Sequence, residues 1–222
     1  FVLRVESCHN VYGRIQPSVQ SHTYQYFGSR VDMSSDGKVV VIGAYLVQNT
    51  VYREGAAFVY EYTGSANGIY SGGSWTHRSS LYSPSPVDNG YFGKSVAISE
   101  DANYVLVGEP RTPASGSVGP YKGAAYIFGR SGNSWGYHTT LVDPDSTPGD
   151  YLGDHANLRL NSDGTHALLG VLNDTGPADN LMQAGKVLYF KRIPGSGGAW
   201  VYVSTIYHHT PTAEDYFGGY AG

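Results

Sequence analysis

The sequence predicts an all-β fold, a β-propeller-like array of four-stranded blades, of which about three and a half are present. Three observations predict it. An aromatic-glycine triplet recurs four times at intervals of 65, 60 and 65 residues, and a tryptophan lies 16 residues before each of the last three triplets. Short apolar runs alternate with Gly-rich turns, and no segment has the periodicity of a helix. The triplets are Tyr26-Phe27-Gly28, Tyr91-Phe92-Gly93, Tyr151-Leu152-Gly153 and Tyr216-Phe217-Gly218, and the tryptophans are Trp75, Trp135 and Trp200.

The triplets divide the chain into repeats. We expect residues 1–25 to end a preceding blade and residues 216–222 to open a further one. Three full repeats lie between them, at residues 26–90, 91–150 and 151–215. Because closed propellers have about four to eight blades, we expect either a longer sequence or several chains that complete the structure together.

Each repeat is predicted to begin with a short strand and a tight hairpin. In the second repeat this strand is Ser95–Ser99, and the turn follows at Asp101-Ala102-Asn103. Asp, Asn and Gly tolerate the positive φ that a tight hairpin requires. The corresponding strands are Arg30–Met33 and Ala156–Leu160, and the corresponding turns are Ser35-Asp36-Gly37 and Ser162-Asp163-Gly164.

Three further strands complete each repeat. The second strand is a continuous apolar run, which predicts cover on both faces. The third begins with small residues, which predicts a close approach of neighbouring sheets at that end. The strand that contains the tryptophan closes the repeat. In chain order the second strands are Val39–Gly43, Tyr104–Gly108 and Ala167–Gly170, the third are Gly55–Tyr60, Gly123–Phe128 and Gly185–Phe190, and the fourth are Trp75–Arg78, Trp135–His138 and Trp200–Val203.

Composition excludes several classes of partner. Only 14% of the residues are charged and the formal net charge is -4, and since Lys and Arg are scattered, we expect no nucleic-acid partner. No run approaches the ~18 apolar residues of a membrane span, so we expect no membrane insertion in this segment. The single cysteine, Cys8, has no partner for an internal disulfide.

The sequence also argues against an enzyme. No Gly-x-Ser-x-Gly segment presents a nucleophile, and the Gly-rich segment at 195–198 lacks the Lys-Ser/Thr of a phosphate loop. The histidines have no metal-ligand spacing. We therefore predict no catalytic residues.

A family resemblance rests mainly on the second repeat. There Phe92–Ser99 is followed by Val105–Pro110 and then by Gly123–Phe128. This order resembles the FG-GAP repeat, the blade unit of integrin α-subunit propellers and of many microbial and protist surface proteins. The resemblance implies a propeller fold and an extracellular or cell-surface role in adhesion or recognition. The Gly-Ala-Pro element itself departs from the family pattern, being Gly43-Ala44-Tyr45, Gly108-Glu109-Pro110 and Gly170-Val171-Leu172.

The resemblance also raises the question of calcium, which family members commonly carry in the first hairpin. The first repeat offers Asp32 and Asp36 there, and these two are the calcium candidates. Because a hard cation needs several oxygen ligands, we favour plain turn chemistry for both. Three acidic residues before the third triplet have no acidic counterparts in the preceding repeat, and we interpret them as a solvated loop: Asp143, Asp145 and Asp150.

The 20 tyrosines are the remaining candidates for function. Those of the triplets recur with the repeat, so we predict that they pack in the core or between blades. Tyrosines of the variable loops are the better contact residues, because repeat scaffolds usually place recognition there. The binding candidates are Tyr45, Tyr52, Tyr70 and Tyr121, and Asn173 in Asn173-Asp174-Thr175 is a glycosylation candidate in a secreted protein.

Our leading hypothesis is a non-enzymatic extracellular or cell-surface scaffold for recognition or adhesion, with a protein or glycan ligand. The alternative is a structural subunit of an extracellular filament or sheath, assembled from copies of itself through open blade edges. A third hypothesis is an accessory module of a larger secreted enzyme.

Overall fold

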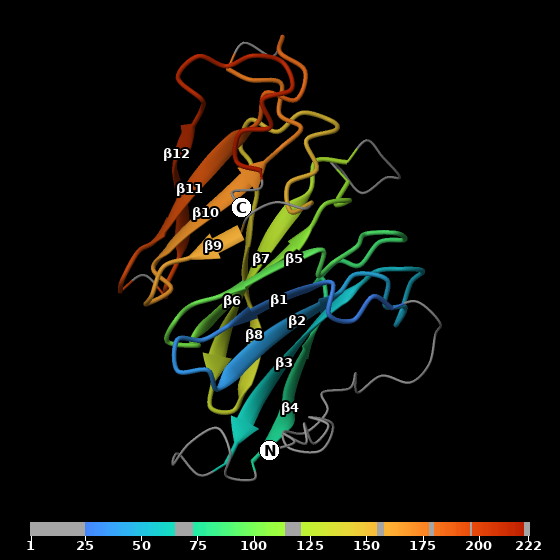
Figure 1. Cartoon of the computed structure of the whole chain (residues 1–222), viewed down its shortest axis with the longest axis vertical. Coiled ribbons are helices and arrows are strands. Elements are labelled where there is room, and N and C mark those ends of the chain that lie inside the picture. The colour runs from blue at the N-terminus through green and yellow to red at the C-terminus, as the bar shows by residue number, and fades with distance from the viewer. Residues whose placement is uncertain are drawn as a thin grey trace, which may run out of the picture.

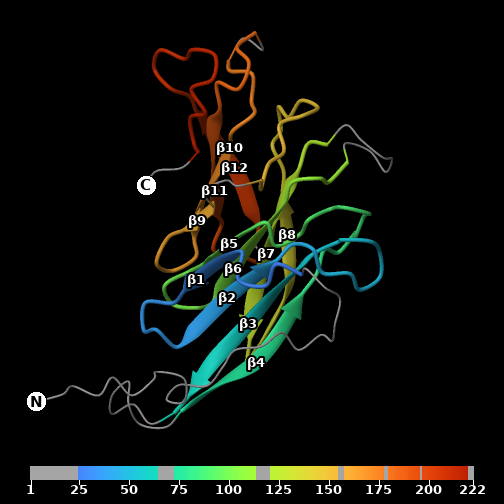
Figure 2. The ribbon, with the colours of Figure 1, turned by 45° about the vertical axis from the view of Figure 1, so that its right-hand side comes forward.

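The computed structural model describes residues 25–64, 73–113, 121–154, 158–177, 180–195 and 197–219. All the secondary-structure elements of these residues are β-strands, which form three four-stranded antiparallel sheets. The predicted all-β class and the four strands per repeat are therefore confirmed. The three sheets follow one another along the molecule, with the second between the first and the third (Figures 1 and 2).

Within each sheet the strands lie side by side in chain order. The first sheet consists of β1 (Arg30–Met33), β2 (Val39–Ala44), β3 (Ala56–Thr63) and β4 (Ser74–Leu81). The second consists of β5 (Ser95–Ile98), β6 (Tyr104–Glu109), β7 (Ala124–Ser131) and β8 (Ser134–Leu141). The third consists of β9 (Leu158–Leu160), β10 (His166–Val171), β11 (Lys186–Arg192) and β12 (Trp200–Ile206).

The hairpins between the first two strands of each sheet form where the turn residues predict them, although in the second hairpin the positive φ falls on Ala102 and not on Asp101 or Asn103. Gly37, Ala102 and Gly164 all have positive φ, of 68°, 59° and 61°. The aspartate before each of them accepts a hydrogen bond from the backbone N–H two residues later, which is the local chemistry of an Asx turn. These bonds run from Lys38 N to Asp36, from Asn103 N to Asp101 and from Thr165 N to Asp163, at 2.9, 3.0 and 3.1 Å.

Two of the three buried clusters lie between sheets. One joins the first sheet, through Val41 and Val59, to the second. Another joins the second, through Leu106 and Ile127, to the third. The remaining cluster belongs to the first repeat alone and includes Phe58. The prediction that the second strands are covered on both faces holds for β2 and, past its first residue, for β6. In β10 this prediction is wrong at Leu168, which is 41% exposed because no described segment packs on the outer face of the third sheet.

The predicted close approach at the start of the third strands is also confirmed. Gly55, Gly123 and Gly185 each form a parallel β-bridge to the middle residue of the next triplet, which is Phe92, Leu152 or Phe217. These bridges connect each sheet to the next segment of chain. Among the described residues no helix has the length and apolarity needed to cross a membrane.

Candidate functional site

The triplet tyrosines lie at the surface rather than in the core. All four have left-handed backbones, with φ between 49° and 62°, a conformation that bulky residues rarely adopt. The side chains of Tyr26 and Tyr216 are 53% and 44% exposed, whereas Phe92 and Leu152, which follow the other two tyrosines, are fully buried. The core position therefore belongs to the residue after the tyrosine, which the turn directs inward. Of the two roles that we expected for the triplet tyrosines, packing between repeats is the one seen at Tyr91 and Tyr151.

The triplet rings contact loop tyrosines, both within a repeat and across the boundary to the next one. The ring of Tyr45 lies between Tyr26 and Tyr91, with centroid distances of 5.2 and 5.8 Å. The ammonium of Lys94 lies 4.0 Å from the centroid of Tyr45, which is a cation-π contact. The first junction thus combines three phenol rings with a cation.

The same arrangement continues at the second junction. The guanidinium of Arg111 lies 4.5 Å from the centroid of Tyr91 and 5.7 Å from that of Tyr121, and Arg111 donates a 3.4 Å hydrogen bond to the Tyr91 hydroxyl. Tyr121 in turn lies 6.1 Å from Tyr151. We call Tyr26, Tyr45, Tyr91, Tyr121 and Tyr151, with Lys94 and Arg111, the tyrosine ladder.

Burial affects the charge of the ladder. Burial is the main cause that lowers the pKa of Lys94. The charges of Arg30 and Arg111 lower this pKa as well, whereas the Asp154 carboxylate raises it. A cation that has lost part of its hydration and is surrounded by like charges gains more from an incoming anion than a fully solvated one. The ladder is therefore a basic aromatic surface suited to an anionic ligand.

The structure brings two of the four predicted binding tyrosines into this surface. Tyr45 and Tyr121 belong to the ladder. Tyr52 is exposed and stands apart from it, with Arg53 4.8 Å from its ring. Tyr70 lies outside the described residues, as does Cys8. Asn173, the predicted glycosylation residue, is partly buried, and its side-chain oxygen accepts a long hydrogen bond of 3.5 Å from Gln183.

The calcium candidates of the first hairpin are occupied by other contacts. The carboxylate of Asp32 accepts bonds from Met33 N and, across the junction, from Ile98 N, both at 2.9 Å. Asp36 accepts bonds from Ser34 Oγ and Lys38 N, and the Ser34 bond is the main cause that lowers the pKa of Asp36. Since the two carboxylates are used in different directions, these residues do not fit a calcium ion.

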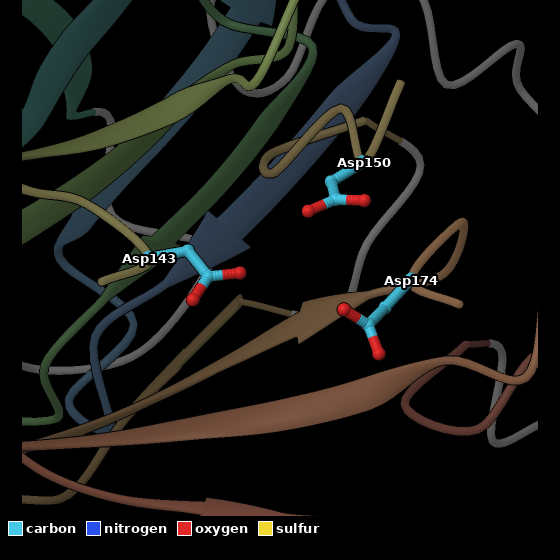
Figure 3. A group of neighbouring side chains, drawn as sticks. All are labelled: Asp143, Asp150 and Asp174. Atoms are coloured by element: carbon cyan, nitrogen blue, oxygen red, sulfur yellow. The ribbon is translucent and has the colours of Figure 1, made fainter. Parts of the chain in front are cut away.

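Acidic side chains do converge elsewhere, at the junction of the second and third sheets. Asp143, Asp150 and Asp174 place ligand atoms within 4.8 Å of one another, and Figure 3 shows their carboxyl groups pointing toward a common centre. The ammonium of Lys186 lies 2.8 Å from Asp143 and 2.6 Å from Asp174, and all four residues are buried. We call these four residues the buried ion cluster.

The buried ion cluster corrects the interpretation of the acidic loop. Asp145 is exposed as expected, but Asp143 and Asp150 are buried, so they do not belong to a solvated loop. Burial disfavours the charge of Lys186, but the hydrogen bonds and charges of Asp143 and Asp174 outweigh it and raise its pKa. The sequence did contain a signal: Lys186 stands at the start of a third strand, where the other repeats have Ala56 and Ala124.

The first junction has a buried carboxyl of its own. Glu109, which takes the alanine position of a Gly-Ala-Pro element, is fully buried and accepts bonds from the hydroxyls of Ser83 and Tyr126 at 2.8 and 2.7 Å. Burial raises the pKa of Glu109, although these hydroxyls favour its charged form. Each junction thus contains a different polar centre beneath the same backbone arrangement.

Comparison with known proteins agrees with the repeat pattern. A family model described as FG-GAP repeat matches residues 20–60 and 75–128. The second match runs from β4 to the aromatic end of the third strand of the second sheet. No curated protein is significantly similar to the chain. The family match over these two segments, together with the repeated triplets and the three equivalent sheets, supports an FG-GAP repeat protein.

Proposed function

We propose that the chain is a non-enzymatic recognition or adhesion module of an extracellular or cell-surface protein, and that its three sheets are blades of a β-propeller. FG-GAP repeats are typical of extracellular recognition modules. The equivalent packing of consecutive sheets, with buried clusters at both junctions, supports the propeller arrangement.

The tyrosine ladder is the observation that supports recognition. Phenol rings provide a large contact area at a low entropic cost, because few rotatable bonds must be fixed. Here the turns hold the backbone of the triplet tyrosines in a strained left-handed conformation, which fixes the direction of their rings and so pre-organises them further. With the cations of Lys94 and Arg111 between the rings, the ladder suits a carboxylate or sulfate group of a protein or glycan ligand.

A double substitution of the two ladder cations tests this function. Lys94→Gln with Arg111→Gln is expected to weaken binding to a sulfated glycan such as heparin, or to a polyglutamate peptide, by about tenfold or more, since two charge-assisted contacts are lost. Binding is measured by surface plasmon resonance at several salt concentrations, with neutral dextran as the uncharged reference.

Arg53→Gln is the matched control, because Arg53 also lies over a tyrosine ring, that of Tyr52, but outside the ladder. It should retain the affinity of the unmodified chain. Equal losses in the double variant and in the control would show general charge attraction and contradict the proposed role of the ladder.

A second candidate function, a structural subunit that assembles with copies of itself, is supported by the outer face of the third sheet. The cross-strand pairs Val41/Val59 and Leu106/Ile127 are buried against the next sheet. The equivalent pair in the third sheet is Leu168/Tyr189, and there Leu168 is exposed. The strand register places two exposed side chains of β12, Val201 and Ile206, on the same face as this pair.

Self-association through this face predicts a concentration-dependent sedimentation coefficient that Leu168→Lys abolishes. The reason is that a lysine at the centre of the contact places an unpaired charge in an apolar interface. Val31→Lys, at an exposed position of β1, is the control for added charge. A sedimentation coefficient that stays constant over the concentration range would contradict this candidate and leave the recognition module.

A further inference from the structure

A cavity of about 510 Å³ continues the tyrosine ladder at its third junction. It lies between the opening of the third repeat, the loop after β10 and the segment that contains the last triplet. The lining residues that matter here are Asp150, Tyr151, Asp154, Asn173, Asp215 and Tyr216. The cavity thus combines two triplet tyrosines with three carboxylates, and its lining contains no lysine or arginine.

Comparison of the repeats explains why the third junction is open. At the first two junctions the chain supplies its own cations, because Lys94 lies over Tyr45 and Arg111 over Tyr91. Lys94 follows the triplet glycine directly, and the residue in that position at the third junction is Gly219. Arg111 is the third residue after Gly108, and its counterpart after Gly170 is Asn173. Both cation positions are therefore neutral at the junction where the cavity lies.

The charge around the cavity complements a cation. Asp150 forms one wall and also belongs to the buried ion cluster, where the single ammonium of Lys186 faces three carboxylates. Asp215 forms another wall; its carboxylate accepts bonds from Thr212 and lies 3.5 Å from the imidazole of His208. Lys94 is a second cation nearby, because the Asp154 carboxylate of the cavity wall favours its charged form. These two permanent positive charges do not balance the five carboxylates of Asp143, Asp150, Asp154, Asp174 and Asp215, so a further cation in the cavity would be stabilised.

The tyrosines indicate an organic cation rather than a metal ion. The Tyr216 hydroxyl donates a 2.8 Å hydrogen bond to Gln183, which holds the ring at the cavity. A guanidinium or alkylammonium group can contact a ring face and a carboxylate together. A bare divalent ion would use oxygen ligands only.

We propose that this cavity binds the cationic end of an arginine or lysine side chain from a protein partner. The inference goes beyond the proposed function, because it concerns a different junction and the opposite ligand charge. The partner's cation would take the place that Lys94 and Arg111 fill at the earlier junctions. The ladder and the cavity would then contact opposite charges along one continuous surface.

The test is a titration of the whole chain, in which binding is monitored by the amide chemical shifts in two-dimensional NMR spectra. The probes are N-acetyl-arginine amide and N-acetyl-lysine amide, with neutral N-acetyl-glutamine amide and calcium chloride as comparison arms. Saturable shifts at Tyr151, Asn173 and Tyr216 are expected with a cationic amide and absent with the glutamine amide. The two cationic probes show which side chain the cavity prefers.

Three variants sharpen the titration. Asn173→Arg, which restores the cation present at the second junction, is expected to abolish binding by occupying the cavity from within. Asp154→Asn removes one lining charge, and Tyr216→Leu removes one ring; each is expected to weaken binding by about three- to tenfold. Asp145→Asn removes the same charge at an exposed position outside the cavity and should bind as the unmodified chain does.

Several results would overturn the inference. One is equal shifts with the glutamine amide, and another is displacement of the cationic amides by millimolar calcium. A third is undiminished binding of the cationic amides by each of the two single variants, Asp154→Asn and Asn173→Arg. Failure of the ladder hypothesis is recognised separately, because the cavity variants keep Lys94 and Arg111 and should retain heparin binding.

Discussion

Replacing Lys186 with methionine is expected to destabilise the chain by about 3–5 kcal/mol, which is typical when one partner of a buried ion pair is removed. The ammonium of Lys186 lies 2.8 Å from Asp143 and 2.6 Å from Asp174. Asp150 adds a third carboxylate within 4.8 Å of the other two. Methionine fills a similar volume but carries no charge, so three buried carboxylates would remain without a counter-ion.

The free energy of unfolding, measured by urea titration, checks this prediction. Lys38→Met is the matched control, because Lys38 is exposed in the first hairpin, and it should change stability by less than about 0.5 kcal/mol. A loss below about 1 kcal/mol for Lys186→Met would contradict the arrangement, since an exposed ion pair contributes only that much.

The pH dependence gives a second measurement of the same cluster. The folded-state pKa of Lys186 is raised above its ordinary value of 10.5, so its contribution is fully present below pH 10.5 and is lost as the pH rises through the raised pKa. The methionine variant should lack this alkaline loss.

The strands could be predicted from the sequence because the repeat supplies independent examples of the same pattern. The triplet and the tryptophan mark equivalent positions in each unit, so one clear strand, such as Val39–Ala44, identifies its counterparts. The turn residues fix the hairpins locally, as at Gly37 and Gly164. Features determined within a few residues were therefore predictable.

The site was less predictable because it depends on backbone conformation and on contacts between distant segments. Period-2 patterning cannot assign a face to Tyr91, since its left-handed backbone breaks the alternation. Loop position singled out Tyr45 and Tyr121, which lie in the tyrosine ladder, but it gave no sign of the cations that stack on their rings. The burial of Asp143 depends on Lys186, which belongs to another repeat. Only the folded junction brings such groups together.

Gly93→Ala is expected to be the second severely destabilising substitution, because this glycine lies where two sheets meet. Its φ of +84° is strained for alanine, at a cost of about 1–2 kcal/mol. A Cβ would also lie 2.1 Å from the carbonyl oxygen of Ala56 and 3.3 Å from the amide nitrogen of Ala44. Neither backbone atom can move without disturbing the first sheet, so we expect a further loss of about 1–3 kcal/mol.

Gly28→Ala separates these two effects. Gly28 occupies the same triplet position with nearly the same φ, +89°, but no described atom lies within 4 Å of the site of its Cβ. Gly28→Ala should therefore show the conformational cost alone, and the difference between the two variants in urea titration should equal the cost of forcing the first two sheets apart. Equal losses would mean that the sheets separate without penalty, which would contradict the close backbone approach that joins the repeats into one array.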